Sequence, residues 1–200
     1  MKRILLSCFA ISLLALPNFA QEANGLRKAP ELAFHLPGQG DALLSQLRGK
    51  VVCVSFILTT CPHCQEASRV MTKLQQEYGP RGFQAVDLAI NGLDEGRTPQ
   101  QADTLVTMFA QTFQVGFPVG WIKRDQFMSF MGFSLAEYTV VPQLALIDRK
   151  GYIHYQTGAR GGAHDEATLR PQIEELLAQS TGASAHSSSK TRTAVAKRTP

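Results

Sequence analysis

Apolar residues along this chain fall into two patterns, which predict strands alternating with helices. Residues 51–58 are almost all apolar, several of them β-branched, as expected of a strand that is covered on both sides of a sheet. In the segment that follows, apolar residues recur three and four positions apart, which is the spacing of one helix face, and Gly79-Pro80 ends it. That face consists of Ala67, Val70, Met71, Leu74 and Tyr78.

Shorter elements are predicted on both sides of this strand and helix. Turn residues separate them, and the last two strands are close enough in sequence to form a hairpin. In order they are an extended piece near residues 32–36, a turn at Pro37-Gly38, a brief helix around residues 42–47, a strand at 83–90, a short strand at 117–120, a helix or turn at 125–133, and hairpin strands at 143–148 and 152–157.

Two more helices complete the pattern. One opens at Thr98, with Pro99 in the first helical position and Gln101 placed to reach back as in a capping box; the other begins near Thr168, with Pro171 in its first turn. This order of elements predicts an α/β layered domain with a central mixed β-sheet. The predicted inner faces are Leu105, Met108, Phe109 and Thr112 in the first of these helices and Ile173, Leu176 and Leu177 in the second.

The two ends of the chain differ from the part between them. Residues 1–20 have a basic start, an apolar stretch and a plausible cut after Ala20, which predicts a cleaved secretory signal peptide and a periplasmic or otherwise exported protein. The apolar stretch is too short to span a bilayer comfortably. Residues 180–200 are Ser, Thr, Ala and Lys without an apolar period, which predicts a disordered basic tail. The folded domain is therefore expected at residues 21–179.

The formal charge of +4 comes from these ends. Residues 21–179 hold 14 basic side chains against 16 acidic ones, a net charge of −2. The predicted domain therefore has no electrostatic footprint for nucleic acid. The composition of the tail favours a solvated segment over one that contacts an anionic envelope surface.

Cysteine placement points to redox chemistry. Removal of the signal peptide leaves Cys53, Cys61 and Cys64, and the sequence Cys61-Pro62-His63-Cys64 stands where the central strand gives way to a helix. The positive end of a helix favours a thiolate, which is the attacking species in disulfide exchange. We expect Cys61 to be the more exposed, attacking thiol and Cys64 to resolve the mixed disulfide. Cys53 reads as a small core residue.

The two residues between the cysteines are expected to tune the thiolate. Pro62 suits the first helical position, and His63, if protonated, adds a favourable charge. A solvent-facing role for His63 is an open alternative, as are a static disulfide between Cys61 and Cys64 and half of a zinc site. No second Cys-x-x-Cys or His pair accompanies the motif, so we predict no metal site and no cofactor.

These motifs together resemble the thioredoxin fold, and in detail the TlpA-like thiol–disulfide oxidoreductases of the redoxin superfamily. The resemblance covers about residues 30–178. It implies a three-layer domain with an extra N-terminal segment and a βα insertion before a cis-proline. The stretches that carry it are Leu47-Arg48-Gly49-Lys50-Val51-Val52, Cys61-Pro62-His63-Cys64, Phe117-Pro118-Val119, and Val141-Pro142 leading into Leu146-Ile147-Asp148-Arg149-Lys150-Gly151.

The resemblance also implies a docking edge and partners. Pro142 corresponds to the family's cis-proline, which faces the cysteines, and Val141 before it would pair with an extended substrate strand. An ordinary trans turn is the alternative. The expected partners are protein thiols and disulfides, together with a membrane or exported redox protein that supplies or accepts electrons.

Several positions depart from the family pattern. Thr60 stands where thioredoxins have Trp, and Ser55 stands where they have a buried Asp, for which Glu66 is only a loose substitute. The Pro-His pair is that of the strongly oxidising DsbA proteins, but the gap from Cys64 to Pro142 is too short for their helical insertion domain. The direction of electron flow is open.

Two other functions share some features with this sequence. Peroxiredoxins share the fold, but their cysteine follows a Pro-x-x-x-Thr/Ser-x-x pattern. Those positions hold Val54 and Leu58 before Cys61, and Ile57 and Cys61 before Cys64. Neither cysteine therefore fits a thiol peroxidase.

A non-catalytic copper carrier of the Sco-like type is the second alternative. Such proteins use Cys-x-x-x-Cys plus a distal His, and the spacing here is one residue shorter, although His154 and His164 are present. An apolar group late in the chain could also form a partner surface, although core is the commoner role. Its members are Trp121, Phe127, Phe130, Met131 and Phe133.

Overall fold

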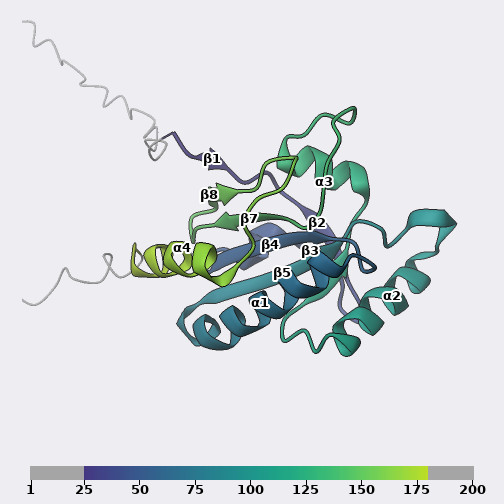
Figure 1. The fold of residues 1–200 in the computed structure, drawn as a ribbon, viewed down its shortest axis with the longest axis horizontal. Helices are drawn as coiled ribbons and strands as arrows, with labels where there is room; N and C mark the ends of the chain where they lie inside the picture. Colours follow the sequence, from purple (N-terminus) through teal and green to yellow (C-terminus); the bar gives the residue numbers. More distant parts are fainter. Residues whose placement is uncertain (1–24, 180–200) are drawn as a thin grey trace, which may run out of the picture.

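A single mixed β-sheet forms the centre of the computed structural model, which describes residues 25–179 (Figure 1). The predicted signal peptide, its cleavage site and the basic tail lie outside the described residues. The sheet order is β1-β8-β7-β4-β5-β6-β2-β3. The strands are β1 (Arg27–Lys28), β2 (Ala33–Leu36), β3 (Gly40–Leu43), β4 (Val51–Ile57), β5 (Phe83–Ala89), β6 (Val119–Trp121), β7 (Gln143–Ile147) and β8 (Tyr152–Gln156).

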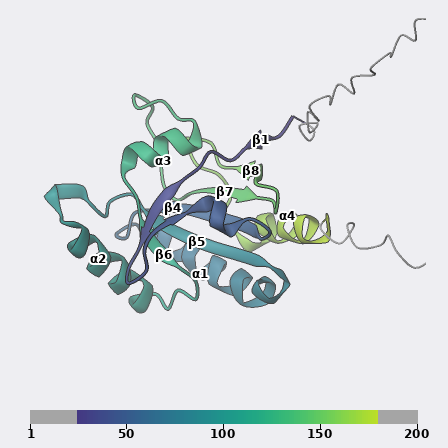
Figure 2. The same cartoon turned by 180° about the vertical axis from the view of Figure 1, so that it is seen from behind.

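Helices cover both faces of this sheet. Helices α1 and α4 lie on one side of the strands and α3 on the other, as both views show (Figures 1 and 2). The predicted three-layer α/β fold is therefore confirmed, and α2, β6 and α3 lie before Pro142, in the part of the chain where a βα insertion was expected. The helices are α1 (Pro62–Tyr78), α2 (Pro99–Thr112), α3 (Arg124–Met131) and α4 (Glu166–Ala178), and the short 3-10 turns are η1 (Leu44–Leu47), η2 (Gly79–Arg81) and η3 (Asp94–Gly96).

The central strand β4 divides the core into two layers. It runs parallel to β5 and antiparallel to β7, and all seven of its residues are buried. Because successive side chains of a strand point to opposite faces, Val52 and Phe56 pack with Phe127 of α3, whereas Val51 and Cys53 pack with the helices opposite. Cys53 is thus a buried core residue, as predicted. The layer opposite α3 includes Met71, Leu74, Tyr78, Leu169, Ile173 and Leu176.

The entry segment shortens one predicted element. The brief helix expected around residues 42–47 is present as the 3-10 helix η1, which begins only at Leu44 because β3 runs through Leu43. Ala42 pairs with Phe34 in a β2–β3 hairpin, which turns at Gly38 with a φ of 74°. Since β2 also pairs with β6, the extra N-terminal segment extends the sheet on that side.

Helix α2 begins as predicted, but its buried face differs. Thr98 and Gln101 form the capping box around Pro99, and Phe109 is buried. Met108, by contrast, is 60% exposed. The prediction assigned large side chains to the buried face of α2. A small side chain, Ala102, makes a close contact there instead, since a Cβ added at Gly92 would lie 3.4 Å from the Cβ of Ala102. The buried residues of α2 are Ala102, Val106 and Phe109, whereas Leu105 is half-buried and Thr112 exposed.

Near the end of the chain, one further prediction is corrected and one is confirmed. Helix α4 begins at Glu166, two residues earlier than expected, because Asp165 caps it by accepting from Thr168 N; Pro171 therefore lies inside the helix. The late apolar group is core rather than a partner surface. Phe127, Phe130 and Met131 are buried, and Phe133 is partly buried against them. Trp121 is partly buried against a separate cluster that contains Cys64 and Val106.

Candidate active site

The two cysteines lie at the first turn of α1, directly after β4 and one short turn. Cys61 is the N-cap residue, with its amide hydrogen-bonded to Leu58 O at 3.1 Å, and Pro62 occupies the first turn, where no amide donor is needed. Cys61 is partly exposed, whereas Cys64 is 0% exposed. Both thiols are free. The expected difference in exposure between the two thiols is therefore present in the fold.

Burial determines the chemistry of Cys64. Loss of solvent raises the pKa of its thiol far above the ordinary value, an effect that the backbone of Leu58 opposes and the Cys61 side chain reinforces. Cys64 therefore holds its proton more firmly than a free thiol does. Its side chain packs among Ile57, Ala89 and Val106 rather than facing solvent.

The loop before β7 faces Cys61. The Val141-Pro142 peptide bond is cis, as the resemblance implied, and the Cys61 thiol donates to Val141 O over 3.9 Å. Gln143 stabilises this loop, because its side-chain amide donates to Val140 O at 2.8 Å and to Gly158 O at 2.9 Å. Within residues 25–179, no hydrogen bond uses the Val141 amide. One strand-like donor is thus available beside the attacking sulfur.

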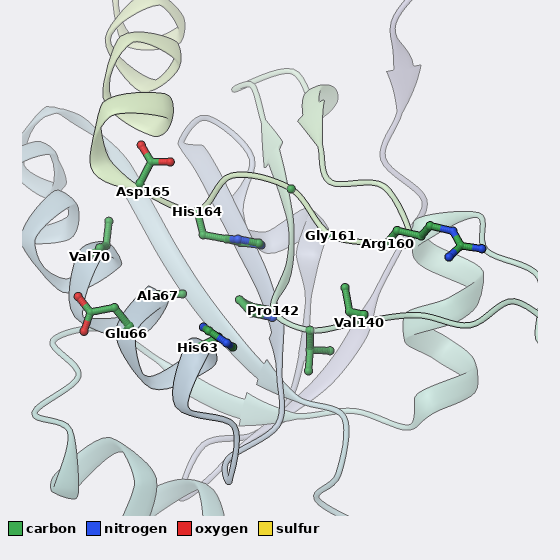
Figure 3. A pocket seen from close by; sticks show the side chains of 12 residues that line it. His63, Glu66, Ala67, Val70, Val140, Pro142, Arg160, Gly161, His164 and Asp165 are labelled. Carbon is green, nitrogen blue, oxygen red and sulfur yellow. The ribbon is translucent and has the colours of Figure 1, made fainter.

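A cavity of about 500 Å³ opens beside this loop (Figure 3). The start of α1, the Val140–Pro142 turn and the loop before α4 form its walls, and Pro142 lies between His63 and His164 in the view. His63 is exposed and lines this cavity, so its side chain is not part of the core. Burial lowers the pKa of His164, which favours its neutral form.

One ionisable side chain near the cysteines was not singled out from the sequence. Asp87, in the middle of β5, is 1% exposed and lies beside Ser55 of β4 in the parallel register. Ser68 Oγ of α1 donates to Asp87 Oδ2 at 2.6 Å. Burial raises the pKa of Asp87 to about 7, although the hydroxyl groups of Ser68 and Ser55 oppose the shift. A lone acid inside the apolar run 83–90 was the sequence signal that could have found it.

Glu66 and His154, also named from the sequence, each pair with another charged side chain. Glu66 is exposed and pairs with Arg69 at 2.9 Å, so it does not supply a buried acid. His154 on β8 pairs with Asp148 at 2.9 Å, whereas His164 lines the cavity beside the Val141 loop. In the described part of the chain, no group of three or more His, Cys, Asp or Glu side chains is placed to hold a metal ion.

Comparisons with known proteins agree with this geometry. The Redoxin family model matches residues 26–170. The thioredoxin-like protein YneN of Bacillus subtilis is 27% identical over 129 residues, which are 64% of this chain and 67% of that protein. Among the residues described, no helix is long and apolar enough to cross a membrane.

Solved structures give the same fold. A candidate thiol:disulfide interchange protein DsbE from Chlorobium tepidum is 25% identical, with a TM-score of 0.60 over 76% of this chain and 96% of its own. A thiol:disulfide interchange protein of the thioredoxin family from Chlorobium tepidum TLS is 22% identical, with a TM-score of 0.59 over 76% of this chain and 97% of its own. The second of these supports the fold alone.

Proposed function

Because the chain belongs to the Redoxin family and is a thiol–disulfide oxidoreductase, we propose that it is an exported enzyme that exchanges disulfides with protein substrates through Cys61 and Cys64. One observation carries the assignment of residues. The partly exposed Cys61 caps α1 and faces Val141 O, while Cys64 is buried one turn behind it. An attacking thiol must be reached by the substrate, and a resolving thiol must be reached only by its partner.

Cys61 performs the first step. Its sulfur lies at the N-terminus of α1, where unpaired backbone N–H groups and the helix dipole stabilise a thiolate. The thiolate attacks one sulfur of a substrate disulfide; a bond forms between Cys61 Sγ and that sulfur, and the other substrate sulfur leaves as a thiolate that takes a proton from solvent. Pro62 and His63 tune this step. Pro62 occupies a first-turn position that needs no amide donor, and His63 adds a positive charge when it is protonated.

Cys64 performs the second step. Once it has lost its proton, its sulfur attacks Cys61 Sγ, the bond from Cys61 to the substrate breaks, and the substrate leaves reduced while the Cys61–Cys64 disulfide forms. The reverse sequence oxidises a substrate dithiol. A membrane or exported redox partner resets the pair, and its potential decides which direction operates.

The substrate is held at the loop beside Cys61. An extended segment that enters next to Val141 finds its free amide and its carbonyl, so two backbone hydrogen bonds can orient the substrate cysteine. Such pairing depends on backbone rather than side chains, which suits an enzyme that acts on proteins. Val141 and Pro142 are thus the proposed docking residues.

Export rests on the sequence of residues 1–20, which have the layout of a signal peptide, with residues 21–179 as the exported domain and residues 180–200 as a tail. An oxidising compartment supplies disulfides for a dithiol of this kind to exchange.

The test is a trapping experiment in cells that express the full chain. In Cys64→Ser the second step is blocked, so stable mixed disulfides through Cys61 are expected in the exported fraction, and they should disappear on reduction. Cys53→Ser, which alters only the buried core thiol, should trap nothing. The assignment is wrong if Cys64→Ser forms no mixed disulfides, or forms them equally when Cys61 is also replaced by Ser.

A further inference from the structure

Three loops meet at the end of the sheet that lies away from Cys61. They are residues 48–50 before β4, residues 79–82 after α1, and residues 148–151 between β7 and β8. Backbone hydrogen bonds join these loops to one another. Gly49 N donates to Arg149 O at 3.0 Å, and Val51 N donates to Gly82 O at 3.0 Å. The loops carry five basic residues, which we call the basic patch: Arg48, Lys50, Arg81, Arg149 and Lys150.

Two arginines of the basic patch bind backbone carbonyl groups. The Arg149 guanidinium donates to Gly49 O at 2.9 Å and to Arg81 O at 3.1 Å. The Arg48 guanidinium donates to Lys150 O at 2.7 Å. A carbonyl group carries no net charge, so these bonds fix the positions of the two cations without cancelling their charge.

Acidic side chains do not neutralise the basic patch. Within residues 25–179, none of its five side chains forms an ion pair with a carboxylate. All of them except the half-buried Arg149 are exposed, on a domain whose net charge is −2. Positive charge is therefore concentrated at this end of the sheet. The acids near the patch have other partners: Asp148 pairs with His154, Glu77 pairs with Arg170, and Glu31 accepts from the amides of Leu32 and Ser45.

The shape of the basic patch fits a broad surface rather than a small anion. A cavity beside Arg48, with Leu47 and Asp148 in its wall, has a volume of only about 10 Å³. Such a volume has room for about one water molecule. The headgroups of an anionic phospholipid layer present many negative charges side by side, and each Lys or Arg near them strengthens binding about fivefold. Cations from three separate loops can contact such a layer together.

The C-terminal end of the domain lies on the same side as the basic patch. Helices α1 and α4 end on this side, as do both coloured ends of the ribbon (Figures 1 and 2). The Tyr78 hydroxyl donates to Glu174 of α4 at 2.6 Å, and Tyr78 directly precedes the loop that carries Arg81. The chain after residue 179 therefore starts on this side of the domain. Its sequence adds four basic residues: Lys190, Arg192, Lys197 and Arg198.

We propose that the basic patch docks the domain on an anionic phospholipid surface, with Cys61 turned away from that surface. At about 3.3 Å per residue, the seven residues of β4 span about 23 Å between the patch and the turn before Cys61. Salt screens charges beyond about 8 Å at physiological ionic strength, so the reactive sulfur lies outside the field of the lipid. The docked domain keeps its dithiol open to proteins in the surrounding compartment. This inference goes beyond the proposed exchange and does not depend on it.

Co-sedimentation with vesicles tests the docking surface. The chain from residue 21 to residue 200, the form expected after export, is mixed with vesicles of phosphatidylcholine and anionic phosphatidylglycerol, or of phosphatidylcholine alone. Wild type should bind the anionic vesicles at about 0.05 M salt and be released at about 0.5 M salt, because salt screens the attraction. The triple variant Lys50→Gln, Arg81→Gln, Lys150→Gln should bind them at least about tenfold more weakly.

A matched variant separates the basic patch from net charge. Arg69→Gln, Lys123→Gln and Arg124→Gln together remove the same charge from exposed positions outside the patch and should bind as wild type does. The tail is intact in both variants, so a difference between them comes from the patch. Far-UV circular dichroism that matches wild type shows that both variants are folded.

The orientation of the docked domain is tested with iodoacetamide. Cys61 should be modified at the same rate on anionic vesicles as in solution, because it lies at the opposite end of β4. A rate about tenfold lower on the vesicles would place the dithiol against the lipid and contradict the proposed orientation. The docking proposal is overturned if the patch variant binds like wild type, or if wild type binds neutral vesicles as well as anionic ones. Binding to polyglutamate but not to vesicles would indicate an acidic protein partner and would also overturn it.

Discussion

The Cys61 thiol donates a hydrogen bond to the Val141 carbonyl, although 80 residues separate them in the chain. The contact brings the first turn of α1 against the loop that begins β7. In the proposed exchange, an incoming sulfur would reach Cys61 Sγ from beside this loop. The same loop offers the Val141 amide, so the proposed exchange and the proposed docking use one edge.

We expect the three described thiols to react at very different rates with iodoacetamide. Cys61 is partly exposed, whereas Cys53 and Cys64 are buried and burial raises the pKa of both. In the native reduced protein, Cys61 should be modified more than about tenfold faster than either of the others. Peptide mass spectrometry after timed quenching measures this, and the same protein in denaturant provides the control with equal access. Faster modification of Cys64 would contradict the assigned roles.

The stability of the fold should fall as the pH rises through neutrality. The unfolded Asp87 has an ordinary pKa near 3.8, whereas the folded group has one of about 7, so folding favours its protonated form. This stability is complete below about pH 4 and is lost by the time the pH passes 7. Between pH 5 and pH 7.5 the loss is about 2.5 kcal/mol by proton linkage.

Urea unfolding of wild type and Asp87→Asn at these two pH values isolates that contribution, since other groups titrate in both proteins. Between pH 5 and pH 7.5, the unfolding free energy of wild type should fall by about 2.5 kcal/mol more than that of Asp87→Asn. Glu66→Gln should show the wild-type dependence. A constant difference between wild type and Asp87→Asn would show that Asp87 is ionised throughout this range.

Gln143 should support both stability and reactivity. It is 0% exposed, and its amide donates to the carbonyls of Val140 and Gly158 on two loops that flank the site. Gln143→Ala removes the side-chain donor of Val140 O and leaves Gly158 O with the Gly161 amide alone, and it should cost about 2–3 kcal/mol of unfolding free energy. It should also slow mixed-disulfide formation, since the Val141 loop loses its support. Gln172→Ala, which removes one bond to Thr168 O on α4, is the matched control and should leave that rate unchanged.

The corrected face of α2 can be checked with two neighbouring truncations. Val106→Ala removes methyl groups from a fully buried position and should destabilise the fold by about 1–3 kcal/mol. Met108→Ala alters a mostly exposed side chain and should change stability by less than about 0.5 kcal/mol. Chemical denaturation of both variants gives the comparison. A larger loss of stability in Met108→Ala than in Val106→Ala would instead support the buried face expected from residue size.

The sequence predicted what depends on neighbours in the chain. The apolar strand, the helix after it and the capping box at Thr98 follow from local spacing and local hydrogen bonds, and Cys61 could be placed at a helix start for the same reason. That Val141 lies close to Cys61 could be predicted only from the family resemblance, because no local sequence rule connects two residues so far apart in the chain.

Asp87 escaped sequence reasoning because its meaning depends on strand register. Ser55 was expected to leave the core near the cysteines without an acid, yet the parallel pairing of β4 with β5 sets Asp87 directly beside it. The buried face of α2 was misjudged for a related reason, since Ala102 lies inward through close approach to Gly92 and not through its size. Both features arise from contacts between segments, which periodicity along one segment does not report.

The outer strands of the sheet limit how another polypeptide can attach. In the described chain, β1 is two residues long, and β3 is four residues long, begins at Gly40 and presents Asp41. Short edges that carry charge or glycine are poor templates for an added strand, so the sheet resists growth by self-association. We therefore expect an extended substrate to pair with the turn at Val141, the proposed docking site, rather than with β1 or β3, and this choice would bring its disulfide beside Cys61.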